Sequence, residues 1–328
     1  MRAENRIVLL GDFGATHLRL ALLGDAGPEQ LVVYAVREWP GIDAAMRDYA
    51  VRTGRNWRGA TFYLAHTGHV ADGALALDYK AERPWSFRLE DVARDFSLAQ
   101  LIAHNDLKAA ACAVLADNGD AFQLLRAGVP RMDSDSVVIG VGTGTGHAYV
   151  SHTNGAVRET FGAHFPPAAV TDRQRAVLDH VRAGVDPART MIIEDILSGA
   201  GLLRVYRALA EIDGKTPCVT AANDLLAQAG SDPLVRESTS LFCEFLGLHA
   251  HILCNAAAAY GGIYLCGGMV ERLNAGGLFD AAAFTRNLHQ AMVPVVARAL
   301  ESLPLYIAAR EHTPLYGLAV CARGGVSG

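Results

Sequence analysis

Apolar residues along the chain follow two patterns: short apolar runs bounded by turn residues and, mainly from about residue 172 onward, apolar positions three or four residues apart. The first pattern is typical of buried strands and the second of amphipathic helices. Strands are predicted at Ile7–Leu10, Leu18–Leu23, Leu31–Val36, Thr61–Ala65, Leu101–His104, Val137–Ile139, Ala148–Ser151, Gly262–Cys266 and Leu305–Ala308. Helices are predicted at Ile42–Thr53, Leu89–Asp95, Lys108–Leu115, Arg173–Arg182, Ile192–Leu197, Gly201–Ile212, Ala221–Ala229, Val235–Ala259 and after Pro314. This mixture predicts an α/β fold.

Two glycine-rich turns each lie between two predicted strands. Gly11–Thr16 breaks the first strand, and Gly140–Gly146 follows the strand at Val137–Ile139. A strand, a tight glycine turn and a second strand make the pattern of a β-hairpin. Both turns open with glycine and carry a threonine five residues later. The repetition predicts two related α/β halves.

The length of 328 residues is large for one hydrophobic core, so we expect two domains. No low-complexity linker divides the chain, so segments near residues 105 and 310 are expected to cross between the domains. We predict a small α/β domain of residues 1–104 with 311–328, and a large α/β domain of residues 105–310.

Composition and charge narrow the class of protein. Hydrophobic residues make up 51% and charged residues 19% of the chain, which indicates a compact fold rather than disorder. The net charge of −5, without a basic run, argues against nucleic acid and anionic membranes as partners. The six cysteines form no Cys-x-x-Cys pair, so we expect free thiols in a reducing compartment. No signal peptide or membrane span is recognisable, which predicts a cytoplasmic protein.

The first glycine turn has the residue types of a phosphate and metal site. Glycines expose backbone N–H groups that suit phosphate oxygens. Asp12 can hold Mg²⁺ through waters, and Thr16 can add a hydroxyl. The alternative is an ordinary hairpin whose aspartate satisfies the turn backbone.

The second turn admits three interpretations: a phosphate hairpin, a dinucleotide-binding loop or a plain turn. A dinucleotide fingerprint needs Gly-x-Gly-x-x-Gly before a helix, but Thr145 stands at the third glycine position and a strand-like run follows. No Gly-Lys-Ser/Thr sequence supports a Walker loop. A nicotinamide-dependent oxidoreductase therefore remains one of the functions open to this chain.

Asn105-Asp106 lies between a predicted strand and a predicted helix. An aspartate there can be a helix N-cap, worth about 1 kcal/mol. It can also be a base that accepts a proton from a hydroxyl attacking phosphorus, since phosphoryl transfer needs such a group beside Mg²⁺ and phosphate cradles.

Six segments in order resemble the bacterial glucokinases of the hexokinase and actin-like ATPase superfamily. They are Gly11–Leu22, His104–Ala109, Gly140–Ala148, Gly162–His164, Glu194–Leu202 and Gly261–Arg272. The resemblance implies a two-domain actin-like ATPase (ribonuclease H-like) fold with an interdomain cleft. It implies an ATP-dependent hexose kinase, a glucokinase forming glucose 6-phosphate, that assembles as a homodimer.

The resemblance also assigns site residues. It makes Asp106 the catalytic base, Asp12 the residue that holds Mg²⁺, and Asn105, His164 and Glu194 contacts to the sugar. The residues expected to bind ATP are Asp12, Gly14, Ala15, Thr16, Gly142, Thr143, Gly144, Gly267 and Gly268.

The chain departs from the family pattern mainly on the sugar side. Phe161 stands where the family has a sugar-binding glutamate, and Phe165–Pro167 replaces polar residues. The segment that usually carries an asparagine before a tryptophan reads Glu82–Trp85, and Ala15 replaces a glycine in the first turn. Loss of one carboxylate hydrogen bond costs about 1.5–3 kcal/mol of binding. The alternative function is therefore a kinase-dead regulator of the same fold that binds sugar or nucleotide.

No cysteine cluster follows His164, so no structural zinc is expected.

Overall fold

A computed structural model describes residues 7–76, 85–116, 121–290 and 293–324, so residues 82–84 of the departing segment Glu82–Trp85 lie outside the described residues. The chain forms two compact units. Unit 1 comprises Met1–Ala121 and His312–Gly328, and unit 2 comprises Phe122–Glu311. Among the described residues, no helix has the length and apolar character needed to cross a membrane.

The first boundary differs from the one predicted after residue 104. Residues 105–121 belong to unit 1 because helix α3 (Asp106–Cys112) packs against the C-terminal helix α11 (Thr313–Ala322). A methyl group added to Gly317 of α11 would lie 1.6 Å from the carbonyl oxygen of Ala109 in α3. The backbones of the two helices therefore touch, and only glycine fits at that point.

Unit 1 is built on a five-stranded sheet of order β3-β2-β1-β4-β8. Its strands are β1 (Val8–Phe13), β2 (His17–Leu23), β3 (Pro28–Ala35), β4 (Thr61–His66) and β8 (Gln100–Asn105). Strands β1, β4 and β8 run parallel, and β2 and β3 complete an antiparallel edge. A separate three-stranded sheet comprises β5 (His69–Ala71), β6 (Ala74–Ala76) and β7 (Ser86–Arg88).

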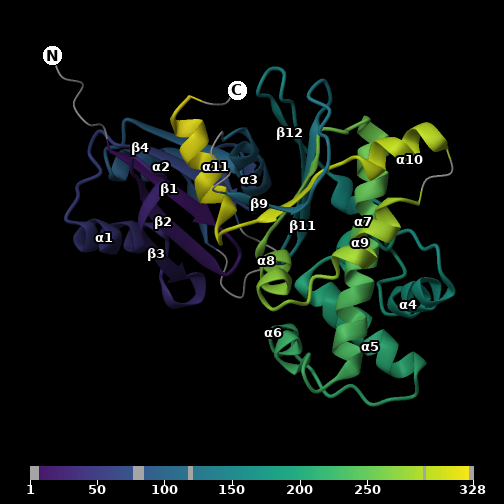
Figure 1. Cartoon of the computed structure of the whole chain (residues 1–328). Helices are drawn as coiled ribbons and strands as arrows, with labels where there is room; N and C mark the ends of the chain where they lie inside the picture. Colours follow the sequence, from purple (N-terminus) through teal and green to yellow (C-terminus); the bar gives the residue numbers. More distant parts are fainter. Residues whose placement is uncertain (1–6, 77–84, 117–120, 291–292, 325–328) are drawn as a thin grey trace. The chain divides into compact units, whose positions relative to one another are not determined.

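Helices cover both faces of the large sheet in unit 1 (Figure 1). Because side chains alternate along a strand, Leu9 and Leu10 of β1 enter different clusters. Leu9 packs with α1 (Ile42–Thr53) and α2 (Leu89–Asp95), whereas Leu10 packs with α3 and α11. The apolar run that predicted a buried strand is thus buried on both sides.

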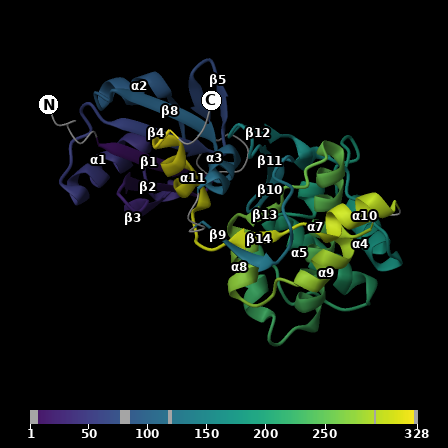
Figure 2. The same ribbon diagram turned by 45° about the horizontal axis from the view of Figure 1, so that its top comes forward.

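Unit 2 is built on a six-stranded sheet of order β12-β11-β10-β13-β14-β9. Its strands are β9 (Phe122–Arg126), β10 (Ser136–Val141), β11 (Thr145–Val150), β12 (Val157–Thr160), β13 (Ile263–Cys266) and β14 (Leu305–Ala308). Its α-helices are α4 (Asp172–Ala183), α5 (Gly199–Ile212), α6 (Ala222–Leu225), α7 (Pro233–Ala257), α8 (Gly268–Ala275), α9 (Ala281–Leu288) and α10 (Pro294–Glu301). Figure 2 shows α7 running beside α9 in this unit.

The two sheets repeat one topology. In each, a hairpin (β1–β2 or β10–β11) has a third antiparallel strand on one side and two parallel strands on the other, and the sheet of unit 2 has one further antiparallel strand, β9, at its edge. The internal repeat expected from the glycine turns is therefore present in the strand order.

Short 3₁₀ turns are η1 (Val36–Glu38), η2 (Ala113–Leu115), η3 (Gly162–His164), η4 (Ile193–Asp195) and η5 (Leu226–Gln228).

Two local predictions were wrong. Strand β1 is not broken at Gly11 but runs through it to Phe13, and the ring of Phe62 lies where a Gly11 side chain would be. The helix predicted at Ile192–Leu197 is only the turn η4. Ser198 ends that turn because its side chain accepts a hydrogen bond from Gly201 and caps a new helix, α5.

Candidate functional site

The carboxyl ends of β1, β4 and β8 meet at one edge of the unit 1 sheet. Phe13 pairs with His66, and His66 pairs with Asn105. Asp12 and Asp106 therefore both lie at this edge, two strands apart. Adjacent strands are about 4.8 Å apart, so β1 and β8 are separated by about 10 Å. The parallel register thus brings together the two aspartates that the sequence singled out.

Asp12 lies in β1 rather than in the turn, and its residue is only 6% exposed. Its Oδ2 atom forms an ion pair with Arg19 of β2 at 3.0 Å. The Nε atom of Arg19 is buried without a hydrogen-bond partner among the described residues. Sequence reasoning missed Arg19, although the register of a tight hairpin places it opposite Asp12.

The first turn, Gly14–Thr16, closes through a hydrogen bond from the Gly14 N–H to the His17 carbonyl at 2.9 Å. None of its residues has a positive φ, so Ala15 is accommodated without strain. The Thr16 hydroxyl and His17 Nδ1 lie 3.0 Å apart. Burial, with the nearby charge of Arg19, lowers the pKa of His17, so its imidazole is neutral at pH 7.

The N-cap of α3 is Asn105 and not Asp106. Asn105 is the N-cap of α3, and its Oδ1 atom accepts hydrogen bonds from the N–H groups of Leu107 (2.9 Å) and Lys108 (3.2 Å). Asp106 is the first helical residue, and its Oδ1 atom accepts a hydrogen bond from the Leu107 N–H at 2.8 Å. The cap uses the side-chain oxygen Oδ1 of Asn105. The side-chain Nδ2 group of the same residue is therefore able to donate to a ligand.

In unit 2, the second glycine turn (Gly142–Gly144) lies beside Gly267-Gly268. Gly267 has a φ of 92°, and a methyl group there would be 2.6 Å from the Val141 carbonyl oxygen. A methyl group on Gly142 would be 3.8 Å from the backbone nitrogen of Gly268. The turn Gly142–Gly144 and the pair Gly267-Gly268, which are both predicted to bind nucleotide, are thus neighbours, because β10 and β13 are adjacent parallel strands.

Glu194 is anchored to the second hairpin. Its Oε2 atom accepts a hydrogen bond from the Thr145 N–H at 2.8 Å. The Thr145 hydroxyl donates to the Leu197 carbonyl, and the Gly199 N–H donates to the Gly142 carbonyl at 3.0 Å. Thr145 was part of the recognised motif, but its anchoring role connects residues 49 positions apart and has no local signal.

The segment Phe161–Phe165 lies next to the turn that carries Glu194. The Ile193 N–H donates to the Phe165 carbonyl at 2.7 Å, which brings His164 and Glu194 onto neighbouring turns. Phe161 is 83% exposed, and its ring centroid lies 5.9 Å from that of His164. An exposed aromatic surface therefore stands where the family pattern has a carboxylate.

A buried histidine pair lies directly beneath that segment. His147 of β11 and His249 of α7 are at most 1% exposed, and their Nε2 atoms are 2.9 Å apart. Both Nδ1 atoms are buried without partners among the described residues, and a methyl group on Gly162 would lie 3.0 Å from Nδ1 of His147. Burial lowers the pKa of His147 well below its ordinary value and that of His249 to about 4.

A hollow of about 720 Å³ in unit 2 adjoins the end of α8. Arg272 of α8 and Gly276, the C-cap of that helix, line it together with Arg236 and Thr239 of α7. The Nε atom of Arg272 donates to the Gly268 carbonyl at 3.0 Å, which links the hollow to Gly267-Gly268. Its volume is in the range of small-molecule sites.

Comparison with known proteins agrees with the arrangement. Residues 9–324 match the family model described as Glucokinase. A glucokinase from Chromobacterium violaceum is 30% identical over 316 residues, covering 95% of this chain and 88% of the relative.

Two solved structures share the fold. The glucokinase of an Antarctic psychrotroph superposes with a TM-score of 0.80 and 26% identity, covering 98% of this chain and all of that one. A ROK family glucokinase from Streptomyces griseus, solved with glucose and AMPPNP, gives a TM-score of 0.65 at 16% identity, covering 97% of this chain and 99% of that one. The actin-like fold implied by the sequence resemblance is therefore confirmed.

Proposed function

This chain belongs to the glucokinase family and is an ATP-dependent hexose kinase, and we propose that it forms glucose 6-phosphate with Asp106 as the catalytic base. The observation that carries the proposal is that Asp12 near the end of β1 and Asp106 just after β8 lie at the same edge of the sheet, on strands about 10 Å apart. Separate carboxylates for the metal and for the proton are what phosphoryl transfer needs from a protein.

In the proposed reaction, Asp106 accepts the proton of the sugar hydroxyl as that oxygen bonds to the γ-phosphorus of ATP. The bond between the γ-phosphorus and the β–γ bridging oxygen breaks, and ADP leaves with the bonding electron pair. The hydrogen bond from the Leu107 N–H fixes Oδ1 of Asp106 at the start of α3. The helix N-terminus also favours the charged carboxylate.

The residues at Asp12 fit Mg²⁺ bound with the nucleotide. Mg²⁺ is commonly held by one or two carboxylates, phosphate oxygens and retained waters. Oδ2 of Asp12 pairs with Arg19, so Oδ1 is the atom proposed to face the hydrated ion. When bound, Mg²⁺ would neutralise charge on the phosphates, and Arg19 would hold the carboxylate in place.

Each unit is proposed to contribute residues that bind ATP and residues that bind the sugar. Gly14–Thr16 in unit 1 and Gly142–Gly144 in unit 2 would offer backbone N–H groups to phosphates. Gly267-Gly268 and the adjoining hollow at Arg272 would take the adenosine end. Asn105, His164 and Glu194 would bind sugar hydroxyls.

Phe161 is proposed to lie against an apolar face of the sugar ring. Its exposed ring beside His164 supports this role, because an aromatic face offers contact area in place of the missing carboxylate. We expect weak glucose affinity or a preference for a related hexose. Phe161→Glu restores the family's residue and should lower the KM for glucose about tenfold or more, measured by coupled ADP release over several hexoses.

The decisive experiment is Asp106→Asn, which keeps the shape and removes the basicity of the side chain. It should lower kcat by at least about a hundredfold while leaving ATP affinity unchanged. Undiminished turnover would refute Asp106 as the base. A wild-type protein that binds sugar or ATP in calorimetry but releases no ADP with any hexose would instead support the kinase-dead regulator.

Two further expectations follow from the family resemblance. We propose a homodimer, to be checked by light scattering, and a cytoplasmic location, to be checked by cell fractionation.

A further inference from the structure

Two cysteines lie on the two helices that join the separate chain segments of unit 1. Cys112 is the last residue of α3, and Cys321 lies near the end of α11. The first belongs to the segment Met1–Ala121 and the second to His312–Gly328. Neither thiol is engaged in a disulfide.

The helix crossing places these cysteines on facing surfaces. Gly317 of α11 meets the backbone of α3 at Ala109 and Ala113. Cys321 follows Gly317 by four residues and Cys112 follows Ala109 by three, so each lies one helical turn beyond the closest approach and on the same face. Cys112 and Cys321 therefore face each other beside one of the tightest helix contacts in unit 1.

The two thiols differ in acidity. The neighbouring Cys321 thiol, with burial, raises the pKa of Cys112, whereas the neighbouring Cys112 thiol and the charge of Lys108 lower the pKa of Cys321. Cys112 is buried and Cys321 is half-buried. A partly exposed thiol near a lysine, with a lowered pKa, is the kind that reacts with disulfides.

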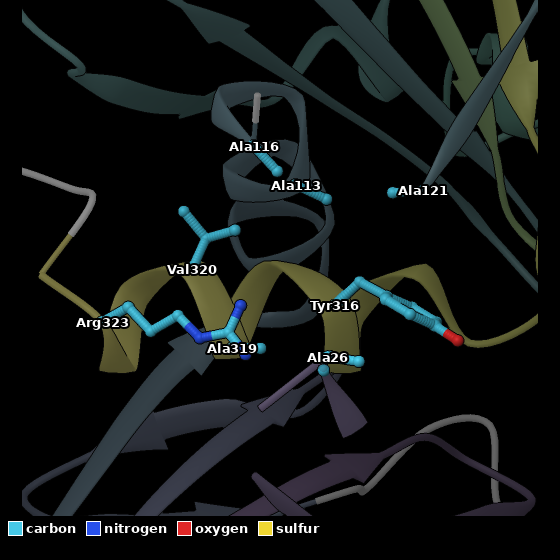
Figure 3. A pocket seen from close by; sticks show the side chains of 9 residues that line it. Ala26, Ala113, Ala116, Ala121, Tyr316, Ala319, Val320 and Arg323 are labelled. Carbon is cyan, nitrogen blue, oxygen red and sulfur yellow. The ribbon is translucent and has the colours of Figure 1, made fainter. Parts of the chain in front are cut away.

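A small pocket lies between the same two helices. A pocket of about 30 Å³ is lined by Ala113 and Ala116 on one side and by Val320 and Arg323 of α11 on the other (Figure 3). Ala113 directly follows Cys112, and Val320 directly precedes Cys321. The pocket is therefore next to the pair along both helices, although neither thiol lines it.

We propose that Cys112 and Cys321 are a reversible disulfide site that locks the C-terminal helix onto the helix that starts with Asp106. The co-reactant is a small disulfide such as oxidised glutathione. The Cys321 thiolate attacks one of its sulfurs and releases one thiol, and Cys112, after losing its proton, attacks Sγ of Cys321 and releases the second. Two cysteine thiols are oxidised, and one disulfide is reduced to two thiols.

The test is incubation of the full chain with oxidised glutathione, followed by alkylation, peptide mapping and thermal unfolding. We expect two fewer free thiols, a mass lower by two hydrogen atoms, and one linked pair of peptides containing Cys112 and Cys321. The oxidised chain should melt at least about 5 °C higher, because the bond closes a long loop of the unfolded chain. Dithiothreitol should reverse all of these changes.

Cys321→Ser tests the pair at its half-buried position, where serine is tolerated, and should abolish the linked peptides and the melting shift. Cys218→Ser is the matched control, since Cys218 is exposed and outside the pair, and it should behave as the wild type. A stable glutathione adduct on Cys321 without the internal bond, linkage through other cysteines, or linkage without a higher melting temperature would each overturn the proposal. None of these readouts depends on kinase activity.

Discussion

The two glycine hairpins occupy the same place in two sheets of the same topology, yet they carry different side chains. In the first, the last residues before the turn include Asp12, paired with Arg19 on the opposite strand. In the second, the strand ends with Val141, which pairs with Thr145 in the register, and the turn Gly142–Gly144 contains no ionisable residue. Ionic groups thus lie beside one turn, and backbone amides dominate the other.

We propose that the two similar hairpins have different roles. The strand order fixes the position of each turn in its sheet, and the residues at the strand ends would determine whether the turn binds a cation or only phosphate oxygens. In unit 2 the nearest carboxylate, Glu194, reaches the hairpin from another segment and accepts a backbone hydrogen bond from Thr145. It therefore orders the turn as well as facing the proposed sugar site.

The largest effect is expected from Asp12→Asn, which removes the carboxylate from the first hairpin. Turnover should fall by at least about a hundredfold and the Mg²⁺ concentration needed for half-maximal rate should rise, because the metal loses its charged ligand. Steady-state kinetics over a Mg²⁺ series measures both. Val141→Ala in the second hairpin is the matched control, and it should cost stability without changing the Mg²⁺ dependence. Equal Mg²⁺ responses of the two variants would contradict the proposed difference in roles.

A smaller effect, on stability, should separate the glycines of the two units. Gly267→Ala places a methyl group against the Val141 backbone at a φ of 92° and should cost about 3 kcal/mol in urea unfolding. Gly14→Ala has no neighbour closer than 3.6 Å and no positive φ, so its cost should stay within about 0.5 kcal/mol. Gly14→Ala should still raise the KM for ATP if phosphate passes over that backbone. Equal stability losses would contradict this account.

The smallest effect is a pH dependence from the pair His147 and His249. Their folded-state pKa values are lowered, so between about pH 6.5 and 4 the unfolded chain takes up protons that the folded pair does not. Stability should therefore fall as the pH drops below about 6.5. Protonation of both rings would also break the bond between the Nε2 atoms, since both would then be donors.

Melting temperatures at pH 7 and 5 measure this effect. The groups around the pair come from β11, α7, β12 and the turn η3, and the titratable or charged ones on the latter two are Arg158, Glu159 and His164, which are all exposed. Replacing both histidines by leucine should reduce the pH dependence, whereas His180→Gln, at a half-exposed histidine paired with Glu211, should not. An unchanged slope in the double variant would exclude the pair as the source.

Local sequence patterns predicted much of the fold. The bounds of α1, α2 and β14 agree with the predicted segments residue for residue, because these elements have a clear period and turn residues on both sides. Strand β9 was missed because it lies at the edge of its sheet. Its Leu124 is apolar but 56% exposed, so the order of apolar and polar residues along β9 does not follow which side chains are buried. Helices α8, α9 and α10 are short and were also missed.

The candidate site was predictable only in part. Glycine turns and the Asn105-Asp106 pair are local signals and could be found from the sequence. The ion pair of Arg19, the hydrogen bond between Thr145 and Glu194, and the pairing of His147 with His249 depend on register and tertiary packing. Periodicity does not report contacts between residues 49 or 102 positions apart.

The split composition of unit 1 has a consequence for the order in which the chain folds during translation. Domains usually fold as they leave the ribosome, N-terminal ones first. Here the nascent chain can supply all of Phe122–Glu311 while the first unit still lacks α11, which covers Leu10 and Ala109. Unit 1 is therefore completed only after unit 2 has been made, and its apolar face at Leu10 and Ala109 stays uncovered until α11 has been synthesised.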